Sequence, residues 1–390
     1  MARELSTDLI HHTYQAPAGF AAPQPGVFKA STVLFKDVAA MRSRDWRSRE
    51  GYTYGLHGTP TTMLLEERIA TLEGGRHCLL VPSGLAAVAL VDLALLGPGD
   101  EVLLPANVYG PSRELARNEL ARWGITHRLY DPLDAVALGA SITAATKLVW
   151  LEAPGSVTME FPDLAALAGV AREGGVLTAL DNTCGAGLAL RGFEQGIDVV
   201  MQALTKYPSG GGDVLMGSVC TVDLALHERI KGTHMRLGLG VAGNDAEMVL
   251  RSLPTMALRY AAQDLAARQL AGWLQTQPQV ARVLHPALPG SPGHEHWVRH
   301  CTQAAGIFSV LLQPHYTQAQ VDRFVDALRL FGIGYSWAGP MSLAVPYDLR
   351  VMRGDTSLLK GHLVRLCIGL EAVVDLQTDL AQALQSAFEA

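Results

Sequence analysis

A lysine beside a glycine-rich turn is the first feature of the sequence that could do chemistry. Lys206 follows an apolar run at 197–204 that is typical of a strand, and a Ser-Gly-Gly-Gly turn occupies 209–212. Burial at a strand end disfavours an ammonium ion, so the lysine pKa falls and the free amine can act as a nucleophile and a base. Lysines beside glycines are also common on protein surfaces, so Lys206 alone does not define a site.

A carboxylate at a second strand end supports the chemical interpretation of Lys206. The apolar run 176–180 ends in Asp181, and the segment between Asp181 and Lys206 leaves room for one crossover between neighbouring parallel strands. An amine and a carboxylate at adjacent strand ends meet the needs of pyridoxal phosphate (PLP). The amine forms a Schiff base with the cofactor, and the carboxylate keeps the pyridine nitrogen protonated.

A strand-to-helix turn supplies a third candidate feature. Ser83, Gly84 and Leu85 lie between a strand-like run at 77–81 and a helix expected over 85–96. Free N–H groups at such a helix start bind phosphate, helped by the helix dipole. A Ser-Gly turn alone is an ordinary junction, but together with Lys206 and Asp181 it predicts a site for PLP.

The composition is that of a globular protein with large cores. The 390 residues are 49% hydrophobic and 17% charged, and the net charge of −6 without a basic block argues against a nucleic-acid partner. No N-terminal apolar region and no membrane-length run is found, which predicts a cytoplasmic protein with no membrane partner. The cysteines are odd in number and widely spaced, so neither disulfides nor a zinc site is expected; they are Cys78, Cys184, Cys220, Cys301 and Cys367.

Changes of pattern divide the chain into three parts. Residues 1–58 are irregular, with a hint of helix only at 38–41, and are expected to form an arm over a neighbouring subunit. Residues 59–250 alternate strand-like and helical runs, which predicts an α/β domain with a mostly parallel sheet and ligands at the carboxyl ends of its strands. The expected helices are 63–73, 85–96, 111–122 and 162–173, and the strands are 77–82, 101–105, 147–152, 176–181, 198–204 and 217–222.

A helical stretch at 245–275, kinked at Pro254, leads to a smaller α+β domain over residues 251–390. Its expected strands are 280–284, 306–312, 334–337 and 363–368, and its helices are 317–330 and 371–388.

Two patterns resemble other kinds of site. Residues 238–243 match GxGxxG, but no strand is expected before them, which disfavours a dinucleotide site. His294, His296 and His300 resemble a metal cluster, but they stand in a polar, loop-like segment with no further ligand set, which disfavours zinc.

Several stretches make the chain resemble the Cys/Met-metabolism family of PLP-dependent enzymes from about Tyr54 onward. Within that family the resemblance is strongest to the carbon–sulfur β-lyase branch, chiefly through Gly155-Ser156 and Tyr335-Ser336-Trp337. The matching stretches are Leu72-Glu73-Gly74-Gly75, Asn107 to Ser112, Leu151 to Ser156, Asp181-Asn182-Thr183, Gln202 to Tyr207, Val283 to Gly290, Tyr335-Ser336-Trp337 and Arg365 to Glu371.

The resemblance implies a fold-type I PLP enzyme with defined residue roles. Lys206 would be the Schiff-base lysine, and Arg365 would bind the substrate carboxylate as a bidentate fork; from the residue alone, Arg365 reads as a surface salt-bridge partner. Tyr109 would stack on the ring, although a structural tyrosine fits the sequence equally well. The implied cofactor-binding residues are Asp181, Gly84, Leu85, Tyr109, Thr183, Thr205 and Tyr54, and the substrate-binding residues are Arg365, Ser336, Trp337, Ser156 and His57.

The implied activity is β-elimination of L-cystathionine, in which Lys206, Tyr54 and Tyr109 are catalytic, within a tetramer built from dimers that share active sites. The family carries an arginine two positions after Tyr54, and here Leu56 stands there, followed by His57. Either His57 or another cation replaces that charge, or cofactor affinity drops; a lost charge-assisted bond to phosphate costs on the order of 1.5–3 kcal/mol. Two other functions remain as hypotheses: a γ-acting lyase or synthase of the family, which would use the same lysine, aspartate and arginine, and a non-catalytic PLP-binding regulatory paralogue, which the leucine at 56 keeps open.

Overall fold

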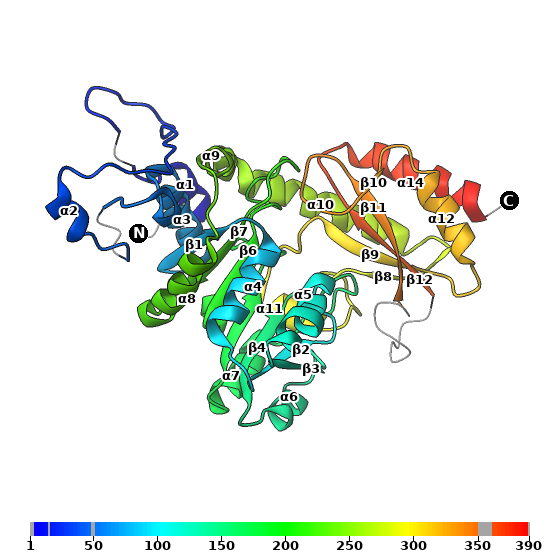
Figure 1. Cartoon of the computed structure of the whole chain (residues 1–390). Coiled ribbons are helices and arrows are strands. Elements are labelled where there is room, and N and C mark those ends of the chain that lie inside the picture. Colours follow the sequence, from blue (N-terminus) through cyan, green and yellow to red (C-terminus); the bar gives the residue numbers. More distant parts are fainter. Residues whose placement is uncertain (1–3, 15, 48–50, 350–360, 389–390) are drawn as a thin grey trace.

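The strand-like runs of the first half of the chain form one sheet (Figure 1). The computed structural model describes residues 4–14, 16–47, 51–349 and 361–388, and within them seven strands pair in the order β1-β7-β6-β5-β4-β2-β3. β7 is antiparallel to both of its neighbours, and the other pairs are parallel. The strands are β1 (His77–Val81), β2 (Glu101–Pro105), β3 (Thr126–Tyr130), β4 (Thr146–Glu152), β5 (Leu177–Asp181), β6 (Val199–Ala203) and β7 (Gly217–Thr221).

Helices cover both faces of this sheet, which confirms the α/β prediction. One face packs on α4 (Gly84–Leu95) and α8 (Leu224–Leu237), and the other on α6 (Ala135–Ser141) and α7 (Leu164–Glu173). The helix predicted at 111–122 is α5 (Gly110–Leu115), continued by a π-helical turn.

The predicted helix before the first strand is α3 (Pro60–Glu73), and its ends follow from its sequence. The Thr59 side chain accepts a hydrogen bond from the Thr62 N–H, and Pro60 occupies the first turn, where no donor is needed. Gly74 ends the helix in the left-handed conformation with φ 74°, which glycine adopts without strain.

The predicted interruption at Pro254 is confirmed. α9 (Gly243–Ser252) ends there in a 3-10 turn, and α10 (Met256–Leu274) continues toward a second sheet beside the first (Figure 1). Within the described residues this sheet has five strands in the order β10-β11-β12-β9-β8, mostly antiparallel. They are β8 (Val280–Leu284), β9 (Ile307–Leu312), β10 (Gly332–Ile333), β11 (Leu343–Asp348) and β12 (His362–Cys367).

α12 (Gln318–Asp326) and α14 (Val373–Phe388) pack with α10 on the second sheet around one apolar core. The strand predicted at 334–337 is wrong: β10 ends at Ile333, and Ser336 has φ 103°, a value that a strand does not accommodate. β11 was not predicted because it contains Pro346. The strand tolerates that proline because, among the described residues, β10 pairs only with Leu343 and Ala344, so no described strand pairs with Pro346 on that side of β11.

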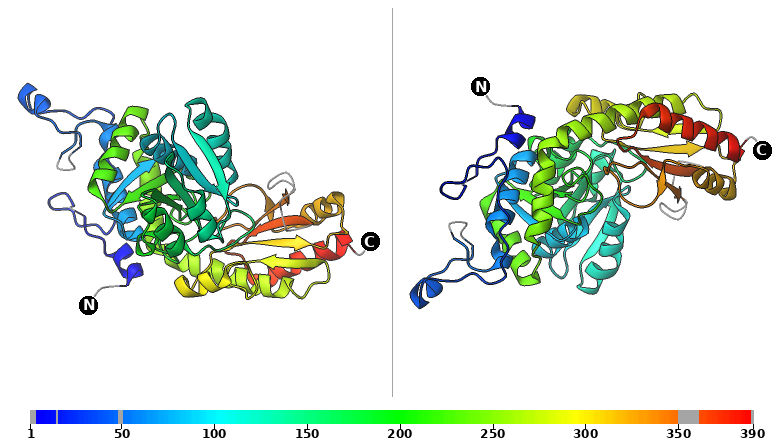
Figure 2. Two further views of the ribbon diagram at one scale, coloured as in Figure 1. Left: turned by 90° about the horizontal axis from the view of Figure 1, so that it is seen from below. Right: turned by 90° about the horizontal axis from the view of Figure 1, so that it is seen from above.

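Two segments expected to be irregular contain short helices. His294–His300 forms α11 rather than a loop, and Leu5–Ile10 forms α1, whose Leu9 is buried in the core beside α3. The predicted helix at 38–41 is confirmed as α2 (Val38–Arg42). The N-terminal segment otherwise runs outside the first sheet and its helices, as the two further views show (Figure 2). No described helix is long and apolar enough to cross a membrane.

Candidate active site

The carboxyl ends of β4, β5 and β6 bring the candidate residues together. Glu152 and Asp181 are the last residues of neighbouring parallel strands and are paired in register. Lys206 follows the next strand, β6, after a short turn. The predicted proximity of Asp181 and Lys206 is therefore present in the structure.

Asp181 is held by a local hydrogen-bond network centred on Thr183. The Thr183 backbone N–H and hydroxyl both donate to Asp181 Oδ1. The same hydroxyl accepts from the Ala203 N–H at 3.0 Å. Thr183 thus ties the end of β5 to the end of β6 and fixes the carboxylate relative to Lys206.

Burial shifts the pKa values of Lys206 and Asp181 in opposite directions. Burial lowers the pKa of Lys206, the Arg365 guanidinium lowers it further, and the Asp181 carboxylate opposes this. Burial raises the pKa of Asp181, whereas the Thr183 hydrogen bonds and Lys206 lower it. A buried amine with a depressed pKa is suited to nucleophilic and proton-transfer chemistry.

The start of α4 lies close to the end of β6. A Cβ added at Gly84 would come 2.7 Å from the Cβ of Ala203, so only glycine allows this approach without movement. The Ser83 hydroxyl caps the helix by accepting from the Ala86 N–H, and among the described residues the N–H groups of Gly84 and Leu85 have no acceptor. Two backbone donors are thus available for an anion.

Thr205, predicted to bind phosphate, has its hydroxyl engaged within the chain. It accepts from the Met216 N–H at 3.1 Å and donates to the Met216 carbonyl at 3.2 Å. A phosphate bond from this hydroxyl would replace the longer of these contacts.

Tyr109, the residue that precedes α5, lies in the same region. Its N–H donates to Glu152 Oε2 at 2.7 Å, and the Ser156 hydroxyl donates to Glu152 Oε1 at 2.6 Å. Burial and the nearby Asp181 and Glu152 carboxylates raise the pKa of Tyr109, yet its side chain remains 43% exposed. The ring therefore lies near Asp181 with one part open to an incoming molecule.

The second sheet contributes Arg365 and the Ser336–Trp337 loop. Arg365 is 8% exposed; its Nη2 donates to the Ser336 carbonyl at 3.4 Å, and its buried Nε has no partner among the described residues. Lys206 Nζ lies 5.7 Å from the centre of the Trp337 ring. A buried guanidinium with an unused donor is suited to bind a carboxylate.

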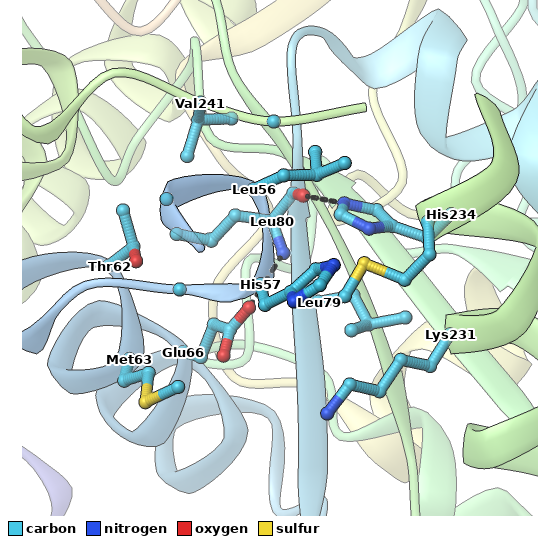
Figure 3. Close-up of a pocket in the computed structure, with 14 residues that line it drawn as sticks. Leu56, His57, Thr62, Met63, Glu66, Leu79, Leu80, Lys231, His234 and Val241 are labelled. Atoms are coloured by element: carbon cyan, nitrogen blue, oxygen red, sulfur yellow. Dashed lines mark hydrogen bonds between the residues drawn. The ribbon is translucent and has the colours of Figure 1, made fainter. Parts of the chain in front are cut away.

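His57 lies apart from this group, in the turn Gly55–His57, which follows Tyr54 and packs against α3, β1 and α8 (Figure 3). Leu56 and His57 line a cavity of ≈ 30 Å³ together with Lys231 and His234, a volume for water-sized groups rather than a cofactor. Burial lowers the pKa of His57, and Lys231 and Arg44 lower it further. Tyr54 is 47% exposed, so its ring is accessible from outside the chain.

Sequence reasoning did not single out three side chains of the site. Glu152 holds Tyr109 and Ser156, and its place at a strand end beside Asp181 was the available signal. Cys184 and Cys367 were noted in the sequence only as cysteines not expected to form a disulfide or a zinc site; burial raises the pKa of each thiol. Arg365 acts electrostatically on both thiols, so they border the site.

The arrangement fits PLP. A buried amine, a carboxylate at the adjacent strand end, unpaired backbone donors at a helix start and an exposed tyrosine ring are groups that this cofactor requires. The buried Arg365 Nε without a partner adds a donor for the carboxylate of an amino acid.

Comparison with known proteins agrees with this geometry. Residues 6–385 match the Cys/Met metabolism PLP-dependent enzyme family, and the chain belongs to it. It is therefore a PLP-dependent enzyme, and its curated relatives place it among the carbon–sulfur lyases.

Two curated relatives and one solved structure define the similarity more closely. A putative cystathionine beta-lyase of Rhizobium johnstonii is 41% identical over 93% of this chain and 91% of its own. The cystathionine beta-lyase of Bordetella avium is 39% identical over 99% of this chain and 98% of its own. The structure of cystathionine gamma synthase from Xanthomonas oryzae, in complex with aminoacrylate and cysteine, has a TM-score of 0.90 at 28% identity and covers 99% of both chains.

Proposed function

We propose that this protein cleaves L-cystathionine by β-elimination to homocysteine, pyruvate and ammonia, a step of methionine biosynthesis. The observation that carries the proposal is the convergence of a buried amine of lowered pKa, Lys206, with Asp181 and Arg365. Relatives named cystathionine beta-lyase, at 41% and 39% identity, support the substrate.

Each group near Lys206 has a role in this proposal. Lys206 would hold PLP covalently, and Asp181, fixed by Thr183, would face the ring nitrogen. The N–H groups of Gly84 and Leu85 would bind the phosphate, with Thr205 as a third donor, and Tyr109 would stack on the ring. When bound, the cofactor supplies an electron sink for the electron pair left at Cα.

Proton transfer falls to Lys206. Once the substrate amino group has displaced it from the cofactor, Lys206 would remove the Cα proton, and its lowered pKa favours the free amine that this needs. Tyr54, acting from a neighbouring subunit together with Lys206, would donate a proton to the departing sulfur or remove one from the incoming amine. The exposure of Tyr54 supports this placement.

The substrate carboxylate would lie against Arg365. The guanidinium of Arg365, in β12, offers its unpaired Nε. Ser336, whose carbonyl accepts from Arg365 Nη2, and Trp337 belong to the neighbouring loop. Ser156, held by Glu152, and His57 of the neighbouring subunit would complete the substrate contacts.

The assembly and the division of the chain belong to the same proposal. We infer a cytoplasmic homotetramer built from dimers that share active sites. An arm at 1–58 would contact the neighbour, a domain at 59–250 would bind PLP, and a smaller domain at 251–390 would close over it. Exposed apolar side chains in the arm, such as Phe20 at 63% and Leu34 at 90%, support burial against a partner.

One other activity is favoured by a specific observation. The cystathionine gamma synthase structure overlies nearly the whole chain, and Cγ chemistry uses the same lysine, aspartate and arginine. A γ-acting enzyme would release 2-oxobutyrate rather than pyruvate. A non-catalytic paralogue remains the third hypothesis, on account of Leu56.

The test is an absorbance spectrum followed by product analysis. We expect a band near ~420 nm, typical of lysine-bound PLP, and pyruvate on addition of L-cystathionine, with the 2-oxo acid identified by chromatography. Formation of 2-oxobutyrate would favour the γ-acting alternative. A band without any 2-oxo acid from cystathionine or related substrates would favour the non-catalytic one.

A further inference from the structure

A buried carboxyl group joins the two strands that carry the candidate active site. Glu73, the last residue of α3, is 1% exposed. The Asn182 side-chain amide donates to its Oε2 at 2.8 Å, and the Gln202 amide donates to its Oε1. Asn182 follows Asp181 directly, and Gln202 lies in β6 just before Lys206.

The two amides are themselves fixed in place. Asn182 and Gln202 are fully buried, and Asn182 also donates to the Leu190 carbonyl at 2.9 Å. A Cβ at Gly185 would come 2.3 Å from Asn182 Oδ1, so glycine at 185 makes room for this orientation. The network is therefore a rigid connection between α3, β5 and β6.

We propose that Glu73 is a positioning residue of the cofactor site, which fixes the strand ends carrying Asp181 and Lys206 and couples its own ionisation to the charge that Asp181 faces. The inference rests on the proposed roles of Asp181 and Lys206. Glu73 itself touches neither substrate nor cofactor.

Several charged and titratable groups, from each of the elements packed around Glu73, influence its ionisation. Burial raises the pKa of Glu73 to about 8; the two amides lower it, Asp181 raises it, and Arg191 lowers it. From β7, the buried Cys220 thiol faces Glu73 and is hydrogen-bonded to Cys78 of β1; Glu66 of α3 acts on the same thiol.

Asp181 is the group that would couple the charge of a bound cofactor to the ionisation of Glu73. A protonated ring nitrogen at Asp181 adds a positive charge that offsets the repulsion between the two carboxylates, so Glu73 ionises more readily. Linkage is reciprocal, and an ionised Glu73 therefore favours the protonated, lysine-bound cofactor. Removing the charge of Glu73 should weaken that form without removing any group that contacts it.

The experiment compares Glu73→Gln with the wild type and with Asp92→Asn. Asp92 is a matched control, because it is also a fully buried carboxyl of raised pKa, but it is bonded to Trp150 and not to either strand end of the site. The readouts are the pH midpoint of the cofactor absorbance and the PLP dissociation constant of the apoprotein. Both are measured independently of turnover.

We expect the midpoint of Glu73→Gln to fall by at least about 0.5 pH unit and PLP to bind roughly 3- to 10-fold more weakly. Glu73→Asp, which retains the charge, should return the midpoint toward the wild-type value, and Asp92→Asn should leave it unchanged. Equal midpoints in Glu73→Gln and the wild type, or equal shifts in Glu73→Gln and Asp92→Asn, would overturn the proposal.

A second variant covers the case in which Glu73→Gln does not fold. Gln202→Met removes one donor and leaves Glu73 in place, so Glu73 becomes harder to ionise and the midpoint should move in the same direction by a smaller amount. No movement in Gln202→Met overturns the proposal. A wild-type protein without any cofactor band would overturn the roles of Lys206 and Asp181, whereas a normal wild-type band with unshifted variants overturns the role of Glu73 alone.

Discussion

We propose that both the Lys206 edge of the sheet and the turn at residues 54–57 serve the cofactor. The two regions differ in how firmly internal hydrogen bonds and packing hold their side chains in place. At the Lys206 edge, Thr183 and Glu152 bind neighbouring groups on two sides. At the turn, Tyr54 is half exposed, and Leu56 packs inward against Gly240, where an added Cβ would come 3.0 Å from its Cδ1. The first region is fixed by hydrogen bonds from several elements, whereas the second is described by one side-chain hydrogen bond, between Thr53 and His57, by the packing of Leu56 and by an accessible tyrosine ring.

This difference indicates where binding energy for the cofactor originates. A region fixed by internal hydrogen bonds pays little ordering entropy on binding. A turn with leucine at position 56 lacks the charge-assisted phosphate bond of the family's arginine unless His57 or another cation supplies it. Variants in the first region should therefore change catalysis strongly, and variants in the second should change affinity modestly.

The largest effect is expected for Lys206→Ala. Loss of the amine removes both the covalent hold on PLP and the base, so pyruvate formation should fall by on the order of 10⁴-fold or more. The absorbance near ~420 nm should vanish as well. Lys147→Ala, which removes an exposed lysine of β4, is the control and should retain full activity. Substantial turnover by Lys206→Ala would contradict the assignment of the site.

Arg365→Lys should have the next largest effect. The charge is kept but the planar fork is lost, so the KM for cystathionine should rise about 10- to 100-fold with a smaller change in kcat. Steady-state kinetics separate the two parameters, and Arg251→Lys, in an exposed pair with Glu247, is the control. An unchanged KM would place the substrate carboxylate elsewhere.

Leu56→Arg tests the weaker region directly. An arginine at 56 would supply a charge-assisted phosphate contact in the proposed shared site, so PLP should bind roughly tenfold more tightly. Fluorescence titration of the apoprotein with PLP measures this, and Leu56→Met controls for side-chain size. If both variants bind PLP as the wild type does, the turn does not reach a phosphate.

Asp92→Asn should alter stability and leave both regions intact. Burial raises the pKa of Asp92 from its usual 3.8 to about 7. Below about pH 4 the carboxyl is protonated in both the folded and the unfolded protein, so it does not lower the free energy of unfolding. Between about pH 4 and about pH 7 it ionises in the unfolded chain but not in the folded protein, so the wild type loses stability over that interval. The variant should lose less over that interval, by on the order of 2–4 kcal/mol. Urea unfolding at pH 5 and pH 8 gives the comparison, and equal losses would contradict it.

Much of the fold was predictable because local patterns and the sheet agree. Six strands of the first sheet are short apolar runs with turn residues at their ends, and Asp181 and Lys206 stand where such runs stop. β3 was missed because its side chains are mostly exposed at a sheet edge, and β11 because Pro346 opposes a strand. These exceptions depend on which edge a strand occupies, which is a property of the tertiary structure.

The site was predictable only in part for a similar reason. Residue type and spacing indicated Lys206, Asp181 and the start of α4 as candidates, and the structure brings these three features together. The hydroxyl of Thr183 bridging two strands, and the carboxylate of Glu152 holding Tyr109, depend on side-chain directions that no spacing rule gives. The inward packing of Leu56 is likewise visible only in the structure.

Tyr207, the residue that follows Lys206, attaches this part of the first domain to the second sheet. Its hydroxyl accepts the Gly306 N–H at 2.7 Å, just before β9, and its ring packs on Trp337 and Tyr260. A displacement of the second sheet would therefore pull on the residue next to the reactive amine. The contacts of Tyr207 that hold the two sheets together therefore also make the position of Lys206 sensitive to the movement of one sheet relative to the other.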